Sequence, residues 1–228
     1  MEIEDKGLCR FCLKTFSGRG MQRHILYCKE KQRKDTEEST KRKNQKKYYL
    51  LKIWSFKPFW LYLEIDTNAT LKELDQFLRD IWLECCGHLS EFEIDGIRYD
   101  SQKLESFWGG PLSKSMNFKL KNVLNVSSTF KYEYDFGSTT HLEGKILSER
   151  KGYMKENIRI LARNDMPEVK CFKCGAKATQ FCFEDDEFYC DKCIIKLGYE
   201  DETLPVVNSP RMGVCAYTGE FDFDDFKR

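Results

Sequence analysis

Two stretches of the chain are hydrophobic almost without interruption: YYLLKIWSF at residues 48–56 and FWLYLEID at residues 59–66. A continuous apolar run of this length is typical of a strand that is covered on both faces of a sheet. Lys57–Pro58 lies between them and suits a tight connection. The pattern therefore predicts two neighbouring strands within a well-covered sheet.

The next segment, LKELDQFLRDIWLECC at residues 71–86, places its apolar residues at helical spacing. Thr70 is a suitable N-cap, and Glu73 stands at the capping-box position. Gly87 can take the left-handed conformation that ends many helices. The segment predicts one main amphipathic helix, whose apolar stripe consists of Leu71, Leu74, Phe77, Leu78, Ile81 and Trp82.

Further strands are expected after this helix. EFEIDGIRYD predicts a hairpin with Asp95–Gly96 at its turn, and TFKYEYD at residues 129–135 alternates polar and aromatic residues. THLEGKILSER at residues 140–150 predicts another strand. One main helix among several strands indicates an α+β fold with a central mixed sheet.

Residues 29–47, KEKQRKDTEESTKRKNQKK, contain no apolar residue. Such a segment cannot bury a hydrophobic face, so it is either a linker or a polar helix that extends from the preceding segment. It marks a boundary ahead of the central sheet.

The composition of this chain, which has 228 residues and 11 cysteines, indicates the compartment in which the protein is expected. No apolar run approaches the roughly 18 residues of a membrane span. The acidic start, MEIEDKGLC, lacks the hydrophobic region of a secretory signal. We therefore expect a cytoplasmic protein without membrane contact, whose reduced cysteines serve as metal ligands rather than as disulfides.

The charge is unevenly distributed, although the net charge is only +1. Residues 1–47 contain 14 Lys and Arg against 7 Asp and Glu, whereas the remainder contains 24 against 30. A basic head on an acidic body favours an anionic partner for the head, such as DNA or RNA. The alternative for residues 29–47 is a solvated linker.

Two Cys-x2-Cys pairs near the C-terminus are the strongest chemical signal: Cys171 with Cys174, and Cys190 with Cys193. Four thiolates at this spacing can surround one Zn²⁺ tetrahedrally, with Zn–S distances of about 2.3 Å. Gly175 follows the first pair, where the turn favours positive φ. These four cysteines predict a zinc module.

A second set of candidate ligands lies near the N-terminus and consists of Cys9, Cys12, His24 and Cys28. The segment resembles the Cys-Cys-His-His zinc finger with its last ligand changed to cysteine, and Phe16 and Met21 stand where that finger has its small core. A unit this short cannot fold by burial alone, so the metal must supply its stability. Two zinc ions are therefore expected in the whole chain.

The finger also offers candidate nucleic-acid contacts. Arg19, Gln22 and Arg23 flank or begin its helix, where zinc fingers present side chains to bases. Arginine suits guanine or phosphate, and glutamine suits adenine. A single finger buries too little surface to read a sequence alone, and many fingers bind proteins instead.

The remaining cysteines do not form a pattern of their own. Cys85 and Cys86 are adjacent, end the predicted helix and are expected to act as buried small hydrophobic residues. Cys182 is expected to be a buried thiol, with metal ligation as the alternative. Cys215 is a single thiol that could join Cys182.

Four segments are expected in the chain. Residues 1–30 form a Cys-Cys-His-Cys zinc finger, and residues 31–47 form a basic polar linker. Residues 48–160 form the α+β domain. Residues 161–228 form the four-Cys zinc module with a docked C-terminal tail, so that two small zinc-binding modules flank the central sheet.

The central domain resembles the plasmid pRiA4b ORF-three-like proteins. The resemblance spans roughly residues 48–150 and is carried by YYLLKIW, TLKELDQFLRDIW, GHLSEFEIDGIRYD and FKYEYDFGSTTHLEGKIL. It implies a passenger of mobile elements without an established activity. NSPRMGVCAYTG, near the C-terminus, resembles a segment of archaeal members.

The chain departs from that family at positions that matter for chemistry. The family commonly has a second histidine where this chain has Ser90, and Asp followed by Trp where it has Ser138 and Thr139. These departures argue against an active or metal site in the central domain. His88, Asp135 and His141 remain a possible polar cluster.

No catalytic residue is assigned. The chain contains no Gly-rich phosphate loop, no His-Glu-x-x-His and no Ser-His-Asp order. The favoured function is a zinc-binding, non-catalytic module that contacts nucleic acid through its finger and linker. The alternative is a zinc-stabilised adaptor that binds a protein partner.

Overall fold

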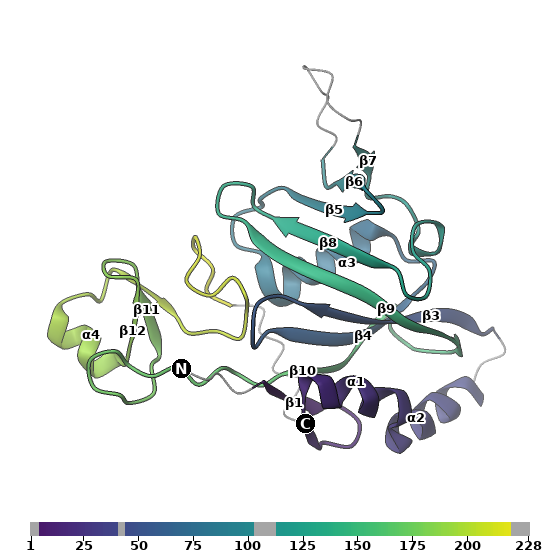
Figure 1. Cartoon of the computed structure of the whole chain (residues 1–228), viewed down its shortest axis with the longest axis horizontal. Helices are drawn as coiled ribbons and strands as arrows, with labels where there is room; N and C mark the ends of the chain where they lie inside the picture. Colours follow the sequence, from purple (N-terminus) through teal and green to yellow (C-terminus); the bar gives the residue numbers. More distant parts are fainter. Residues whose placement is uncertain (1–4, 41–43, 103–112, 220–228) are drawn as a thin grey trace.

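The computed structural model describes residues 5–40, 44–102 and 113–219 (Figure 1). Within these ranges a ten-stranded mixed sheet, four α-helices and Cys-rich clusters near both ends confirm the expected α+β class. The strands of the central sheet are β1 (Lys6–Cys9), β2 (Thr15–Ser17), β3 (Lys46–Trp54), β4 (Trp60–Asp66), β5 (Ser90–Ile94), β6 (Ile97–Asp100), β7 (Lys114–Ser115), β8 (Thr129–Tyr134), β9 (Thr140–Gly152) and β10 (Ile158–Asn164). The helices are α1 (Gly18–Tyr27), α2 (Lys29–Thr40), α3 (Leu71–Leu78) and α4 (Asp191–Leu197), and a short 3-10 helix covers Leu120–Asn122.

The central strands pair in the order β2-β1-β10-β4-β3-β9-β8-β5-β6-β7. All of these pairs are antiparallel except that of β6 with β7. The hairpin of β1 and β2 therefore extends the central sheet through β10. The domain limits expected from the sequence stay predictions.

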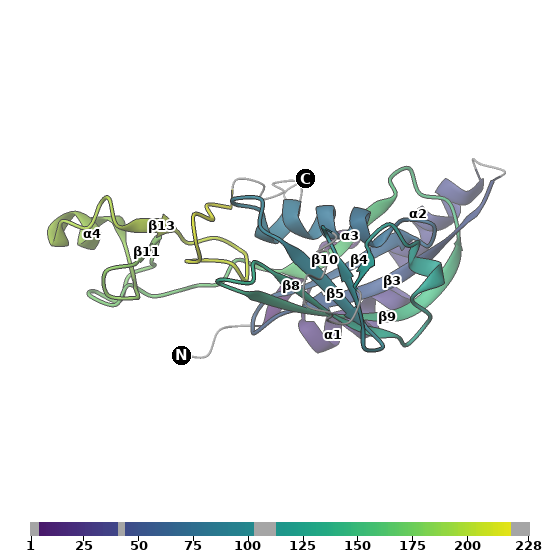
Figure 2. The ribbon, with the colours of Figure 1, turned by 90° about the horizontal axis from the view of Figure 1, so that it is seen from above.

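Strand β4 lies inside the sheet and is buried along its whole length. Because side chains alternate along a strand, Leu61, Leu63 and Ile65 pack in one core with α3, whereas Trp60 and Tyr62 pack in another with α1. The two helices accordingly lie on opposite faces of the sheet (Figure 2). The continuous apolar pattern thus reflects a strand covered on both sides, as expected.

The N-terminus of α3 is the predicted capping box. The Thr70 hydroxyl accepts the backbone N–H of Glu73 at 3.1 Å, and the Glu73 carboxylate accepts the N–H of Thr70 at 2.7 Å. These two bonds satisfy donors that have no partner within the helix.

The end of this helix differs from the expectation. A π-helical turn, Arg79–Leu83, follows α3, and Glu84 is already extended with φ −67° and ψ 124°. The Glu84 carboxylate accepts the N–H of Gly87 at 2.6 Å and Nη1 of Arg79 at 2.9 Å, so it stabilises the departure from the helix. Cys85 and Cys86 consequently lie beyond the helix, which corrects their placement at its end.

Strand β10 was not predicted by the hydrophobic pattern. Its sequence, IRILARN, contains Arg159 and Arg163, each only 5% exposed. Arg159 pairs with Glu64 on β4, and Arg163 Nη2 donates to the carbonyl of Asn208 at 2.7 Å. Because tertiary contacts compensate these buried arginines, their polarity does not mark an exposed face.

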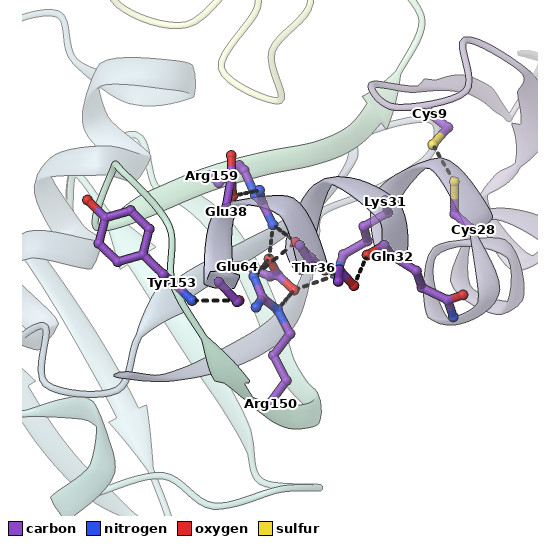
Figure 3. A network of polar contacts seen from close by, with 12 residues as sticks. Cys9, Cys28, Lys31, Gln32, Thr36, Glu38, Glu64, Arg150, Tyr153 and Arg159 are labelled. Carbon is purple, nitrogen blue, oxygen red and sulfur yellow. Dashed lines mark hydrogen bonds and ion pairs between the residues drawn. The ribbon is translucent and has the colours of Figure 1, made fainter. Parts of the chain in front are cut away.

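Residues 29–40 form the polar helix α2, which binds the sheet through buried ion pairs (Figure 3). Lys31 Nζ lies 2.7 Å from both Asp35 and Glu64. The Glu64 carboxylate also binds Arg150 at 2.6 Å and Arg159 at 2.7 Å. Arg159 in turn binds Asp35 and Glu38. Three cations thus meet three carboxylates: Lys31, Arg150 and Arg159 with Asp35, Glu38 and Glu64.

The C-terminal part forms a small module beside the central sheet (Figure 1). Its three strands, β11 (Gln180–Cys182), β12 (Glu187–Tyr189) and β13 (Thr203–Pro205), pair in the order β12-β11-β13, and α4 completes it. The yellow segment after β13 returns to the central sheet (Figure 1). There Ser209 Oγ donates to the Trp82 carbonyl at 2.5 Å. Ser209 thus ties this segment to the π-helical turn after α3, and the expected docking of the whole tail stays a prediction.

Among the described residues, no helix combines the length and the hydrophobicity that crossing a bilayer requires.

A carboxylate pair on β5 and β6 predicts a pH effect on stability. Glu91 faces Asp100 across the two strands, and burial together with this neighbour raises the pKa of Glu91 to about 7. The folded protein then binds this proton more tightly than the unfolded chain. The contribution of protonated Glu91 to the free energy of unfolding is therefore fully present below about pH 4.5 and is lost as the pH rises to about 7. We expect Glu91→Gln to raise the melting temperature at pH 8 but not at pH 4.5. Glu93→Gln, a more exposed change on the same strand, should leave the pH profile unchanged, and equal profiles for both variants would contradict the prediction.

Candidate metal centres

Three clusters in the described part of the chain could hold a metal ion. In each cluster, the four potential ligand atoms lie within 4.8 Å of one another. The N-terminal cluster is Cys9, Cys12, His24 and Cys28. The C-terminal cluster is Cys171, Cys174, Cys190 and Cys193. The middle cluster is Cys85, Cys86, His88 and Cys215.

The N-terminal cluster is assembled by the β1–β2 hairpin and α1. The N–H of Cys9 donates to the Lys14 carbonyl at 3.0 Å, and Leu13 takes a positive φ of 56°, so the chain turns tightly after Cys12. Ser17 caps α1 by accepting the N–H of Gly20 at 3.2 Å. This helix then directs His24 and, at its end, Cys28 toward the hairpin cysteines.

The imidazole of His24 is held in a suitable orientation and protonation state. Its ring stacks on Phe16 with centroids 4.0 Å apart, and its Nε2 lies 3.2 Å from Cys12 Sγ. Burial lowers the pKa of His24, and Lys14 lowers it further, which favours the neutral form that binds metals. Met21 is fully buried beside the cluster, as the finger-like core requires.

The C-terminal cluster is built from two similar turns. The N–H of Gly175 donates to the Cys171 carbonyl at 2.9 Å, and Gly175 takes the expected positive φ, at 73°. Cys190 is the N-cap of α4, and the N–H of Cys193 donates to its carbonyl at 2.9 Å. Burial raises the pKa of Cys171, but backbone N–H groups of Cys190 and Cys174 outweigh it and lower that pKa to about 6. This thiolate is stabilised before any metal binds.

One sulfur–sulfur distance in each terminal cluster fits tetrahedral coordination, whereas Cys12 Sγ and His24 Nε2, 3.2 Å apart, lie closer than two ligands of one ion. Ligands at normal zinc distances are separated by about 3.8 Å for two sulfurs and about 3.6 Å for sulfur and nitrogen. Cys9 Sγ lies 3.9 Å from Cys28 Sγ, and Cys174 Sγ lies 3.7 Å from Cys190 Sγ. All eleven cysteines are free thiols. The structure thus brings together both sets of four candidate ligands that the spacing predicts.

The middle cluster was missed by the sequence argument. Cys86 and Cys215 are exposed and Cys85 is half-buried, so the adjacent pair is not a buried hydrophobic element. Cys215 Sγ lies 3.7 Å from Cys86 Sγ, although 129 residues separate them. Ser90, Ser138 and Thr139 argue against a metal site at the family's own positions, and the candidate ligands of the middle cluster lie at other positions.

The remaining candidate residues lie in different parts of the structure. Cys182 is fully buried in the small core of the C-terminal module, as expected for a buried thiol, and is not part of the three clusters. His88 Nδ1 lies 3.6 Å from the Asp135 carboxylate, but His141 pairs with Glu133 at 3.3 Å instead. The three-residue polar cluster is therefore reduced to His88 with Asp135.

The three candidate nucleic-acid contacts lie on one helix and have exposed side chains. Arg19, Gln22 and Arg23 are all exposed on α1. The polar segment after α1 offers less free charge than its composition indicates, because Lys31 is buried against Glu64 and the exposed Arg33 pairs with its own helix neighbours.

A comparison with known protein families finds a match for the central part of the chain. Residues 50–145 match the Plasmid pRiA4b ORF-3-like protein family. The expected resemblance is confirmed for this segment. The pRiA4b ORF-3-like segment includes Cys85, Cys86 and His88, whereas Cys215 and both terminal clusters lie outside it.

One similar solved structure is that of a protein of unknown function, MM3350 from Methanosarcina mazei Go1. It is 20% identical, with a TM-score of 0.44, over 59% of this chain and 78% of that chain. No curated protein matches the sequence.

Proposed function

We propose that the protein is a zinc-binding, non-catalytic module of the cytoplasm that contacts nucleic acid through the exposed face of α1. The donor sets support zinc, because three cysteines with one histidine at the N-terminal cluster and four cysteines at the C-terminal cluster are sets found in structural zinc sites. Each would hold one ion. Reduced thiolates of this kind persist in the cytoplasm.

The observation that carries the nucleic-acid proposal is the placement of α1 by the N-terminal cluster. His24 and Cys28 face the hairpin, which leaves Arg19, Gln22 and Arg23 on the exposed side. Arg19 and Arg23 are four residues apart and therefore share a helix face. Two guanidinium groups on one face suit successive phosphates, and Gln22 beside them can reach a base edge.

Deletion of residues 1–47 is a poor test, because it would remove β1 from the edge of β10 and Lys31 from Glu64. The double variant Arg19→Ala/Arg23→Ala leaves these contacts in place. We expect it to weaken binding of short DNA or RNA duplexes and to reduce the slope of log K against log salt by about 2, as two phosphate contacts require. Fluorescence anisotropy at several salt concentrations measures both quantities.

The matched control is Arg98→Ala/Lys131→Ala, which removes two exposed cations from β6 and β8; their side chains are 59% and 68% exposed. The control should keep the wild-type slope. If the α1 variant also keeps it, α1 is not the nucleic-acid surface.

A protein partner is the second candidate function, favoured by exposed apolar residues on the finger. Tyr27 is 72% exposed, Leu13 59% and Leu26 40%. A nuclease-treated pull-down that recovers one stoichiometric protein from wild type, but not from Tyr27→Ser, would support the adaptor over the nucleic-acid module. Recovery of the same protein by both would exclude Tyr27 from the contact.

A further inference from the structure

The middle cluster joins two parts of the chain that are distant in sequence. Cys85, Cys86 and His88 follow the π-helical turn after α3, whereas Cys215 belongs to the tail that returns from the C-terminal module. All four ligand atoms lie within 4.8 Å of one another.

We propose that Cys85, Cys86, His88 and Cys215 form a third zinc site, which fastens the C-terminal tail to the central sheet. This site is independent of the nucleic-acid proposal and adds one ion to the two already proposed. The donor set is three cysteines and one histidine, the same as that of the N-terminal cluster.

The distances support coordination rather than a disulfide. Cys86 Sγ to Cys215 Sγ is 3.7 Å, and Cys215 Sγ to His88 Nε2 is 3.5 Å. A zinc tetrahedron requires about 3.8 Å and about 3.6 Å for these two edges. A disulfide requires about 2.05 Å. The first separation fits a metal site and is too long for a bond.

The backbone explains how adjacent cysteines can both reach one ion. Glu84 is extended, and Gly87 turns the chain with φ 71°. On the tail, Cys215 itself takes a positive φ of 55°, a conformation that non-glycine residues rarely adopt. Such a conformation persists where surrounding contacts require it, and ligation of Cys215 would supply one.

Residues around the cluster are arranged as in a metal site with supporting contacts. His88 turns Nε2 toward Cys215, and its Nδ1 lies 3.6 Å from the carboxylate of Asp135, on the side where metal-binding histidines commonly have a carboxylate partner. Asp135 is itself held by Arg211 Nη2 at 2.6 Å and by the N–H of Gly137 at 3.0 Å. The imidazole thus lies between Asp135, which follows β8, and Cys215 of the tail.

The charge of the site is also compensated. Three thiolates and one Zn²⁺ leave one net negative charge. Arg211 is fully buried in the tail, and its Nη2 donates to the Asp135 carboxylate at 2.6 Å. This guanidinium comes from the same tail segment as Cys215, and Asp135 lies between it and His88.

Zinc content of the full-length chain tests the proposal directly. Protein purified with a reductant should carry three zinc ions by native mass spectrometry, and Cys215→Ser should carry two. Cys215 is exposed, so serine at this position leaves the core packing intact. The control Cys182→Ala removes a cysteine outside all three clusters and should keep three.

Cobalt loading provides a second readout. The thiolate charge-transfer absorption of the cobalt-loaded protein should fall by about one third in Cys215→Ser and remain unchanged in Cys182→Ala. Equal zinc content in wild type and Cys215→Ser would overturn the third site. A Cys86–Cys215 disulfide in protein that holds two zinc ions would also overturn it. Either result leaves the two terminal sites untouched, whereas a wild-type count below two contradicts those sites.

Discussion

Removal of zinc is expected to unfold the C-terminal module while the central sheet stays folded. The core of this module is small, and cysteines make up much of it: Cys171, Cys182, Tyr189, Cys193 and Ile194. Structural zinc in units of this size contributes on the order of 10 kcal/mol. Without the ion, too little apolar area remains to offset the conformational entropy of folding. The central core, by contrast, combines α3 with many residues of the sheet.

The N-terminal finger should respond less strongly to chelation. Met21 and Ile25 of α1 pack against Trp60 and Tyr62 of the sheet, and β1 pairs with β10. These contacts do not involve the candidate ligand atoms, so we expect them to persist without metal. Hydrogen exchange measured with and without a chelator should therefore show complete loss of protection in residues 171–204 and partial loss in α1. Full protection of residues 171–204 in metal-free protein would contradict a zinc-dependent module.

Two cysteine variants separate ligation from packing. Cys174 is exposed and belongs to the cluster, whereas Cys182 is fully buried and lies outside it. Burial alone would make Cys182→Ala the more damaging change. We expect the reverse: Cys174→Ala should abolish protection of the module, and Cys182→Ala should cost about 1 kcal/mol of packing. If Cys182→Ala is the more destabilising, metal binding does not stabilise the module.

Substitution of Glu64 is expected to have the second-largest effect. Glu64 is 1% exposed and lies between Arg150, Arg159 and Lys31. Glu64→Gln keeps the shape of the side chain but leaves the buried Lys31 and Arg159 and the partly buried Arg150 with less compensating charge. Breaking a buried ion pair in this way costs about 3–5 kcal/mol. Urea unfolding at pH 7 measures the loss, and it should reach this size although no apolar atom is removed.

The same carboxylate predicts acid sensitivity. Burial raises the pKa of Glu64, but Arg150, Lys31 and Arg159 outweigh it and lower the pKa to about 2 from its ordinary 4.5. Ionised Glu64 therefore contributes about 3 kcal/mol to the free energy of unfolding. This contribution is fully present above about pH 4.5 and is lost as the pH falls to about 2. Glu64→Gln should lose less stability than wild type across this window.

The control for Glu64 is Glu143→Gln, an exposed change on β9. It should unfold like the wild type at pH 7. Equal stabilities of Glu64→Gln and Glu143→Gln at pH 7 would show that the network between α2 and the sheet adds no stability.

Features with short sequence separation were predictable. The capping box joins Thr70 to Glu73, and the turn at Asp95–Gly96 adopts positive φ at both residues. The Cys-x2-Cys pairs form tight turns because two thiolates three positions apart can reach one point only if the chain turns between them. The two hydrophobic strands were recognisable because both faces of the sheet are covered.

Polar residues misled the sequence argument wherever a distant partner compensates them. Arg159 obscured β10 because Glu64, Asp35 and Glu38 neutralise it in the interior. The composition of α2 indicated a solvated segment, yet Lys31 is buried. The polarity of a side chain indicates how strongly it favours water over the protein interior. It does not indicate whether a compensating charge lies nearby in the fold, as Glu64 does for Arg159 across 95 residues of sequence.

The amino-acid sequence by itself determined the α+β class and the two terminal sets of four candidate ligands, because local periodicity and spacing encode them. Its motifs also carried the family resemblance of the central segment. Only the tertiary structure decided how α2 binds the sheet, where β1 and β10 pair and which residues surround Cys215. These features depend on contacts between segments that are separated in the chain, from Lys31 with Glu64 to β1 with β10. Such contacts form when strands and tail dock, and no local pattern specifies them.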